Sequence, residues 1–303
     1  MVQTCVATLR ELAEGDPRIV VLGADFCDVG EALGQNCSKQ YIEMGIAESN
    51  LIGAAGGMST CGLIPYVYAV APFLAYRANE FIRDDLCMQK RNVKILAFSA
   101  GMDYSFMGPA HYTTEDIAML RAMPNLTVLC PASAKEVREM VRAAAEIPGP
   151  VYIRLGRERN REIHEGDYSF ELGKAVELHC GGDAALVSTG TISWEALRTV
   201  KLAEKKGVHV RLLHMGTLKP FDSDAVLQAA RETKRVITLE EHSVIGGLGG
   251  AVCETISTVG LAVPVTRLGL PDIFASGYGY HDDIKRLNGL DVPHILEELC
   301  RQT

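Results

Sequence analysis

The sequence has 303 residues, which is more than one simple core needs and suits two domains. Hydrophobic residues make up 48% of it, so each half can bury a core of its own. The formal net charge of −8 argues against a general nucleic-acid binder and against a basic protein of membrane surfaces.

The nine cysteines are scattered along the chain and form neither a CxxC pair nor a zinc-type spacing. An odd, dispersed set is typical of reduced thiols, and with no signal peptide in view we expect a cytoplasmic protein. The longest apolar run, over 62–75, is interrupted by Pro65 and Pro72. It is too short to span a bilayer, so no membrane segment is expected.

Apolar spacing predicts the elements of the first half. In chain order we expect a helix over 1–15, a strand over 18–22, a strand that turns into a helix over 41–57, a strand over 63–70, a helix over 73–90, a strand over 92–98, a helix over 114–122, a strand over 126–129, a helix over 133–146 and a strand over 150–154. This alternation indicates a doubly wound α/β domain, with a mainly parallel sheet and helices on both faces. Sites in such sheets form at the carboxyl ends of the strands, so the candidate loops are 23–38, 44–48, 71–73 and 99–112.

A charged, turn-rich stretch over 157–173 separates this half from a smaller α/β pattern. The second half is expected to contain strands over 184–188, 208–213, 235–239 and 263–267, and helices over 193–206, 222–231, 246–259 and from about residue 292. We therefore predict domains over 1–160 and 173–303, joined by a linker over 161–172. The glycines of 240–250 turn a strand into a helix whose start could hold an anion, although close packing at a subunit contact is the simpler interpretation.

The most informative side chain of the first half is Glu48, in the stretch from Tyr41 to Gly57. It lies at the first turn of a helix rich in glycine and alanine, beside apolar neighbours such as Ile46. The helix dipole favours a charged carboxylate there, whereas burial favours a protonated one. Small residues would let this helix approach a flat group or another backbone closely. A solvated glutamate that opens an ordinary helix is the alternative.

Gly45-Ile-Ala-Glu-Ser-Asn50, followed by Gly-x-x-Gly-Gly, resembles the GIAEQN segment in the pyrimidine-binding domain of the transketolase family, which includes deoxyxylulose-phosphate synthase. The resemblance extends over nearly the whole chain. It implies a pyrimidine-binding domain followed by a smaller transketolase C-terminal domain. It also implies thiamine diphosphate as the cofactor.

The resemblance assigns roles around that cofactor. Glu48 is implied to protonate, or share a proton with, its aminopyrimidine ring, with Ile46 beside it in the site. In the family, aromatic side chains at the start of the next helix stack on this ring. Phe73 fits that role best and Tyr76, three residues later on the same helix face, is second; both could instead be core residues.

A further cofactor contact is implied at the end of the first strand. Gly23-Ala-Asp25 resembles the family's SAD sequence, so Asp25 would face the cofactor. A turn aspartate that bonds its own backbone is the alternative.

The substrate side of the site is implied by a glycine- and proline-rich loop. Met107-Gly-Pro-Ala-His111 falls where the family has Asp-Gly-x-Thr-His-Gln. His111 is retained, and it is implied to contact substrate hydroxyls and to assist proton transfer. Met107, Ala110 and Tyr112 replace the usual neighbours, which argues for a specialised sugar.

Arg157 matches a family arginine that binds the substrate phosphate, a task that the planar guanidinium suits because it meets two oxygens at once. Arg154 is expected to be structural. The second phosphate arginine, expected near the N-terminus, has no counterpart, so the phosphorylation of the substrate stays open.

The magnesium motif of the family, Gly-Asp-Gly followed by Asn-Asn, is absent, and Gly181-Gly-Asp183 lacks the rest of it. No metal ligand is therefore expected in this chain. The resemblance implies the C-terminal subunit of a split transketolase, which transfers a two-carbon ketol unit from a ketose (phosphate) to an aldose. A separate N-terminal subunit with the GDG/NN motif would hold Mg²⁺, and thiamine diphosphate would lie between the two in an α2β2 assembly.

Three alternatives stay open. The chain could be the beta subunit of a 2-oxo-acid dehydrogenase, although Gly-Ile-Ala-Glu and Glu-Asp-Ile-Ala-Met-Leu fit transketolase better. It could be related to deoxyxylulose-phosphate synthase, which is normally one chain. It could also be a non-catalytic scaffold, which the retained Glu48 and His111 argue against.

Overall fold

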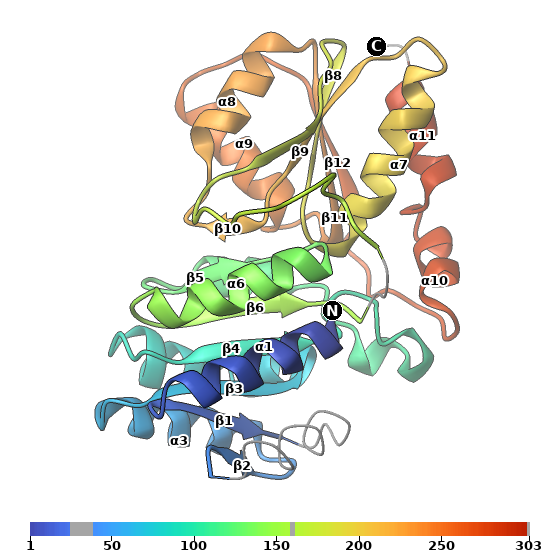
Figure 1. Ribbon diagram of the computed structural model, residues 1–303. Helices are drawn as coiled ribbons and strands as arrows, with labels where there is room; N and C mark the ends of the chain where they lie inside the picture. Colours follow the sequence, from blue (N-terminus) through green and yellow to red (C-terminus); the bar gives the residue numbers. More distant parts are fainter. Residues whose placement is uncertain (25–38, 158–160, 302–303) are drawn as a thin grey trace.

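A computed structural model describes residues 1–24, 39–157 and 161–301 of the chain. The described residues form two sheets with helices on both sides of each, one above the other in Figure 1. Both sheets are mainly parallel, which confirms the predicted α/β class with two doubly wound halves. In the part of the chain that the structure describes, no helix is both long and apolar enough to cross a bilayer.

The first sheet has seven strands in the order β10-β5-β6-β4-β3-β1-β2. Their bounds are β1 Ile19–Gly23, β2 Tyr41–Glu43, β3 Ile64–Val70, β4 Lys94–Phe98, β5 Thr127–Leu129, β6 Val151–Leu155 and β10 Thr217–Lys219. Every pairing is parallel except that of β10 with β5. The central strands β3, β4 and β6 are buried throughout, as expected of parallel strands covered on both faces.

Two cores cover the two faces of this sheet. On one face α1 (Val2–Gly15) packs beside α6 (Ala134–Glu146), and both lie in front of the sheet in Figure 1. The other face is covered by α3 (Glu48–Thr60), α5 (Asp116–Arg121) and the segment 73–87. Gly56 in α3 lies close to Leu86, so the small residues of this helix let it pack against the neighbouring segment.

The segment after β3 is not the single helix predicted over 73–90. It contains a π-helical turn over Phe73–Arg77, the short α4 over Asn79–Phe81 and a second π-helical stretch over Ile82–Cys87. The side-chain amide of Asn79 donates to the carbonyl of Ala75 at 3.0 Å, which competes with regular helix bonding at the junction. π-Helical turns within helices are frequent at functional sites.

The second sheet has five strands in the order β12-β11-β8-β9-β7. Its elements are β7 Val176–His179, β8 Ala184–Ser188, α7 Ser193–Glu204, β9 Val210–His214, α8 Ser223–Glu232, β11 Val236–Ser243, α9 Leu248–Thr258, β12 Val265–Leu270, α10 His281–Leu287 and α11 Val292–Cys300. Helices α7 and α11 pack on one side and α8 and α9 on the other (Figure 1). The sequence pattern did not predict β7, β10 or α10.

Strand β10 joins the two halves. It belongs to the second half in sequence, yet it pairs with β5 at the edge of the first sheet. Residues past the predicted linker therefore complete the N-terminal sheet. The domain limits proposed from the sequence stay a prediction.

Candidate functional site

Glu48 is a buried carboxylate at the carboxyl edge of the first sheet. Strand β2 ends at Glu43, the chain turns at Gly45, and Glu48 begins α3. Its side chain is 3% exposed, although the neighbouring Ile46 is 72% exposed. Arg77 Nη1 donates a hydrogen bond to Glu48 Oε2 at 2.6 Å and pairs with it ionically. The surface-glutamate alternative is therefore wrong.

Phe73 lies beside this ion pair, at the start of the π-helical turn that also carries Arg77. The guanidinium carbon of Arg77 is 4.6 Å from the centre of the Phe73 ring. The His111 ring meets Phe73 edge to face, with 5.3 Å between their centres. The aromatic ring predicted for the cofactor thus contacts the predicted histidine directly and the predicted acid through Arg77.

His111 ends a short 3₁₀ turn over Pro109–His111 and packs against two aromatic rings. Besides Phe73 it contacts Tyr104, whose ring centre is 5.4 Å away. Burial lowers the pKa of His111 below its ordinary value of 6.5, because desolvation disfavours the charged imidazolium. Its Nδ1 atom is buried and has no hydrogen-bond partner among the described residues.

Arg157 follows β6 and completes the row of contacts. Its guanidinium carbon is 4.8 Å from the centre of the Tyr104 ring and 5.7 Å from that of Phe106. Its backbone N–H donates to the Asp103 carboxylate. The contacts therefore run without a break from Glu48 to Arg157 through residues that follow β2, β3, β4 and β6. The loops after β2, β3 and β4 were among the candidates from the sequence, whereas the stretch after β6 was not.

The structure does not bring every predicted residue into this row. The hydroxyl of Tyr76 is hydrogen-bonded to the Glu115 carboxylate and accepts from the backbone N–H groups of Thr114 and Glu115. Burial, with the acidic Asp116 nearby, raises the pKa of Tyr76 far above its ordinary range, so the hydroxyl stays protonated. Asp25 lies outside the described residues.

Arg154 is structural, as expected. It is buried and pairs with Asp116, with 2.9 Å between Arg154 Nε and Asp116 Oδ2. It also donates to the carbonyls of Thr113 and Glu241, so it ties the loop after β4 to the second half.

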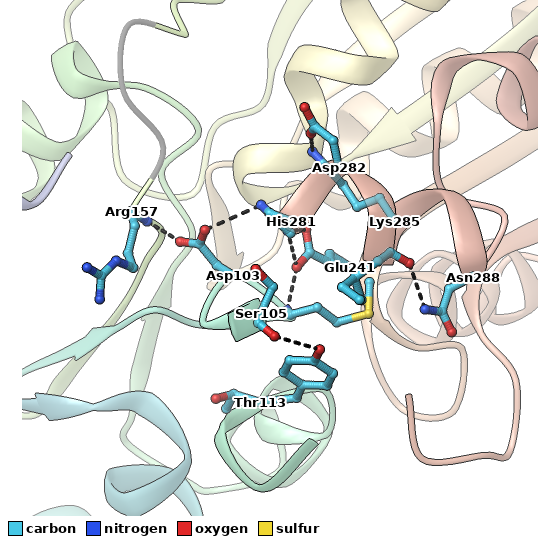
Figure 2. Close-up of polar contacts among 12 residues, drawn as sticks. Asp103, Ser105, Thr113, Arg157, Glu241, His281, Asp282, Lys285 and Asn288 are labelled. Carbon is cyan, nitrogen blue, oxygen red and sulfur yellow. Dashed lines mark hydrogen bonds and ion pairs between the residues drawn. The ribbon is translucent and has the colours of Figure 1, made fainter. Parts of the chain in front are cut away.

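Three residues that the sequence analysis missed connect the two halves next to Arg157 (Figure 2). His281 Nδ1 lies 3.3 Å from Asp103 Oδ1, and His281 Nε2 lies 2.9 Å from Glu241 Oε1. Burial alone would raise the pKa of Glu241, but the charge and hydrogen bonds of His281 outweigh it and lower that pKa to about 2. We call Asp103, His281 and Glu241 the His281 network.

A cavity of about 260 Å³ opens beside the His281 network. Asp103, Arg157, Arg161, Tyr280, His281 and Asp282 line it. Its residues come from the loop after β4, from the stretch after β6 and from the start of α10. Only Arg157 was predicted, because nothing local in the sequence reports that residues 280–282 lie here.

A second buried network resembles a catalytic triad but is enclosed. Ser193 Oγ lies 2.7 Å from His214 Nδ1, and His214 Nε2 lies 3.1 Å from Glu136 Oε2. Glu136 Oε1 also contacts His164 Nε2 at 2.8 Å. Ser193, His214 and Glu136 are all fully buried, so no substrate reaches the hydroxyl. We call Ser193, His214, Glu136 and His164 the His214 network. It joins α6 to the predicted linker and to the second half.

The glycine-rich start of α9 is occupied by the chain's own carboxylate. Glu240 accepts hydrogen bonds from the backbone N–H groups of Leu248 and Gly249, at 2.7 and 2.8 Å. A carboxylate there satisfies the unpaired amides of the first turn. The idea of an anion site at this helix start is therefore wrong.

Comparison with known proteins covers both halves of the chain. Residues 1–162 match the transketolase pyrimidine-binding domain, and residues 173–295 match the transketolase C-terminal domain. A putative transketolase C-terminal section from Methanocaldococcus jannaschii is 35% identical over 303 residues, which are 97% of this chain and 95% of that protein. One subunit of an apulose-4-phosphate transketolase from Phocaeicola vulgatus is 37% identical over 269 residues, covering 88% of this chain and 85% of the relative.

A solved structure is similar over the same length. It is described as a split-gene transketolase in an inactive β4 tetramer, and it is 39% identical with a TM-score of 0.90. The match covers 98% of this chain and 95% of that one. Sequence and structure agree over both domains, and the chain belongs to the transketolase family.

Proposed function

We propose that this chain is the C-terminal subunit of a split transketolase, which transfers a two-carbon ketol unit from a ketose to an aldose acceptor. Family membership implies thiamine diphosphate as the cofactor. The observation that carries the proposal is the buried Glu48 carboxylate, which Arg77 links to the Phe73 ring by contacting both. A protonatable group next to a flat apolar face is what an aminopyrimidine needs: one partner for its ring nitrogen and one surface for stacking.

The described residues fit that ring. When bound, thiamine diphosphate supplies the carbon nucleophile that cleaves and forms the bond next to the substrate carbonyl. Glu48 holds a proton at the far ring nitrogen, and Phe73 supports the ring face. The exposed Ile46 offers an apolar contact to the cofactor. Asp25 and Tyr76 stay predicted contacts, and the hydrogen bonds of Tyr76 to residues 114 and 115 do not favour its role.

On the substrate side, His111 and Arg157 have separate tasks. The lowered pKa of His111 keeps its imidazole neutral at pH 7, so it can both accept and donate protons at substrate hydroxyls. Arg157 is the anion-binding residue, because its guanidinium suits a phosphate. The relative named for apulose-4-phosphate supports a specialised sugar that ends in a phosphate.

The proposal includes a partner. Among the described residues no cluster of histidine, cysteine and acidic side chains could hold a metal ion. We place Mg²⁺ on a separate N-terminal subunit that carries the GDG/NN motif, with the cofactor between the subunits of an α2β2 enzyme. The solved relative supports this, because its β4 tetramer is described as inactive. The seven described cysteines are free thiols, which favours the cytoplasm as the compartment.

Reconstitution tests the proposal. The chain is mixed with an N-terminal transketolase subunit, thiamine diphosphate and Mg²⁺, and ketol transfer is measured from a panel of ketoses and ketose phosphates. We expect transfer by the pair and none by either subunit alone. Full activity of this chain alone would contradict the split arrangement. Decarboxylation of 2-oxo acids, or of pyruvate with an aldehyde acceptor, in place of ketol transfer would favour the alternatives; a pair inert to all of them would favour a scaffold.

A further inference from the structure

Arg77 makes both of the contacts that the proposed function assigns to the aminopyrimidine ring. Its guanidinium lies over the Phe73 ring, 4.6 Å from the centre. The same group donates to Glu48 Oε2 at 2.6 Å. A guanidinium resembles the edge of an aminopyrimidine whose ring nitrogen is protonated, because both are flat and both present an N–H donor to the carboxylate in their plane.

Local structure explains how one side chain reaches both groups. Phe73 and Arg77 are the first and last residues of one π-helical turn, so their side chains share a face of the segment. Glu48 begins α3, which packs against that segment. No distant part of the chain is needed to bring the three together.

The exposure of the two partners is unequal. The Glu48 side chain is 3% exposed, whereas the Arg77 side chain is 49% exposed. A buried carboxylate is costly without a partner, so the ion pair with Arg77 stabilises the Glu48 carboxylate. Arg77 can turn out into solvent, whereas Glu48 is fixed. Of the two partners in this ion pair, Arg77 is therefore the one that can move away from the site.

We propose that the Arg77 side chain occupies the aminopyrimidine position and must swing out before the cofactor ring can bind. The inference rests on the proposed function, which places that ring on Phe73 and Glu48. It assigns to Arg77 the role of an autoinhibitory residue. Only molecules in which Arg77 is displaced can bind the ring. The observed dissociation constant is therefore the intrinsic one divided by the fraction of molecules with Arg77 displaced.

Thiamine tests this directly, because it carries the aminopyrimidine without the diphosphate that needs a partner subunit. Its affinity for the full chain is measured by calorimetry for the wild type, for Arg77→Met and for Arg83→Met. Methionine keeps an unbranched stem and removes the guanidinium. Arg83 is the matched control, since it lies on the next π-helical stretch, is exposed and pairs only with the surface Asp84 among the described acidic residues.

We expect Arg77→Met to bind thiamine about tenfold more tightly or better, with Arg83→Met equal to the wild type. Adding Glu48→Gln to Arg77→Met should remove most of that gain, because the ring nitrogen then loses its acid. If Arg77→Met misfolds by circular dichroism, Arg77→Lys serves instead. Lysine keeps a cation for Glu48 but uncovers the ring, and a smaller gain is expected.

Unchanged, weaker or undetectable thiamine binding by the folded Arg77 variants would overturn the inference. Its failure is distinguishable from that of the proposed function. If the reconstituted pair transfers ketol units and needs Glu48, while the Arg77 variants gain no affinity, the autoinhibitory role alone is wrong. If the pair shows no ketol transfer, the function itself is wrong.

Discussion

Under the proposed function, His111 is a residue that packing prepares for chemistry. Its ring is wedged between Phe73 and Tyr104, and its Nδ1 atom has no partner in the described part of the chain. An unpaired buried nitrogen is costly in a fold that gains nothing from it. The same atom is useful where a substrate hydroxyl replaces the missing partner. The row of contacts thus leaves one polar atom ready for a ligand.

The pH dependence of the reconstituted enzyme follows from this residue. Burial disfavours the imidazolium and lowers the pKa of His111, so the active neutral form persists below pH 6.5 and is lost only at more acidic pH. We predict an acid limb in kcat/KM that lies below pH 6.5. In His111→Asn the rate should fall roughly 10²–10⁴-fold and this limb should disappear. His209→Asn, at an exposed position, is the control. An unchanged acid limb in His111→Asn would contradict the role of His111 in proton transfer.

Arg157 carries the substrate anion in this account, and the structure gives its guanidinium two aromatic supports. Tyr104 and Phe106 both lie against it, and the cavity beside the His281 network lies next to it. Stacking on the rings restricts the side chain and leaves the planar edge for oxygens. The sequence predicts this role for Arg157, but it could not predict these two aromatic contacts.

At the scale of elements, helix α6 is fastened to the second half through one carboxylate. Burial alone would raise the pKa of Glu136, but the charge of His214, the hydrogen bonds of both histidines and the Ala132 amide lower it to about 2. Its ordinary value is 4.5. Because the folded-state pKa is depressed, the ionised group stabilises the fold above about pH 4.5. That stabilisation is lost as the pH falls from there towards 2.

Glu136→Gln should therefore lower the free energy of unfolding at pH 7 by roughly 1–3 kcal/mol, because buried donors lose their carboxylate. The difference from the wild type should stay constant above pH 4.5 and shrink below it. Urea unfolding followed by circular dichroism at several pH values measures both. Glu139→Gln on the same helix is the control, since Glu139 is partly exposed and its ion pair with Arg142 is a surface contact. A difference that does not shrink in acid would show that ionisation of Glu136 is not the cause.

The segment 73–87 shows where element prediction stopped. Its apolar spacing predicted one helix, whereas two π-helical stretches flank the short α4. The periodicity of apolar residues indicates which face of a segment is buried. It does not distinguish an α-helical turn from a wider π-helical one. Arg77 was missed for a related reason. It stands four residues after Phe73, and on a helix that spacing alone could have placed the two side chains together.

Over the whole molecule, the alternation of strands and helices was enough to predict two α/β halves with sites at the carboxyl strand ends. The contacts from Glu48 to Arg157 follow from that topology and from residues in four loops. What could not be predicted depends on long-range pairing. Strand β10 crosses from the second half into the first sheet, and His281 meets Asp103 across 178 positions of the chain, since 281 − 103 = 178. Local sequence carries no signal for such contacts.

The two halves are joined at several separate places: the pairing of β10 with β5, the His281 network and the His214 network. Both halves therefore help to position the site. Gly101 illustrates how close they approach. Its φ of +72° is left-handed, and a Cβ there would lie 2.5 Å from Glu241 Oε1. Only glycine satisfies both conditions without displacement. The His281 network lies next to Gly101. Through Asp103 it fixes the loop 99–112, which also carries His111.

The central claim is that the buried Glu48 activates a cofactor bound across two subunits, and one substitution tests it. Ketol transfer by the reconstituted pair is measured for Glu48→Gln and for Glu14→Gln, a surface helix glutamate that also contacts an arginine. We predict that Glu48→Gln lowers kcat roughly 10²–10⁴-fold while sedimentation shows unchanged assembly, and that Glu14→Gln matches the wild type. A Glu48→Gln enzyme with the wild-type kcat would contradict the account.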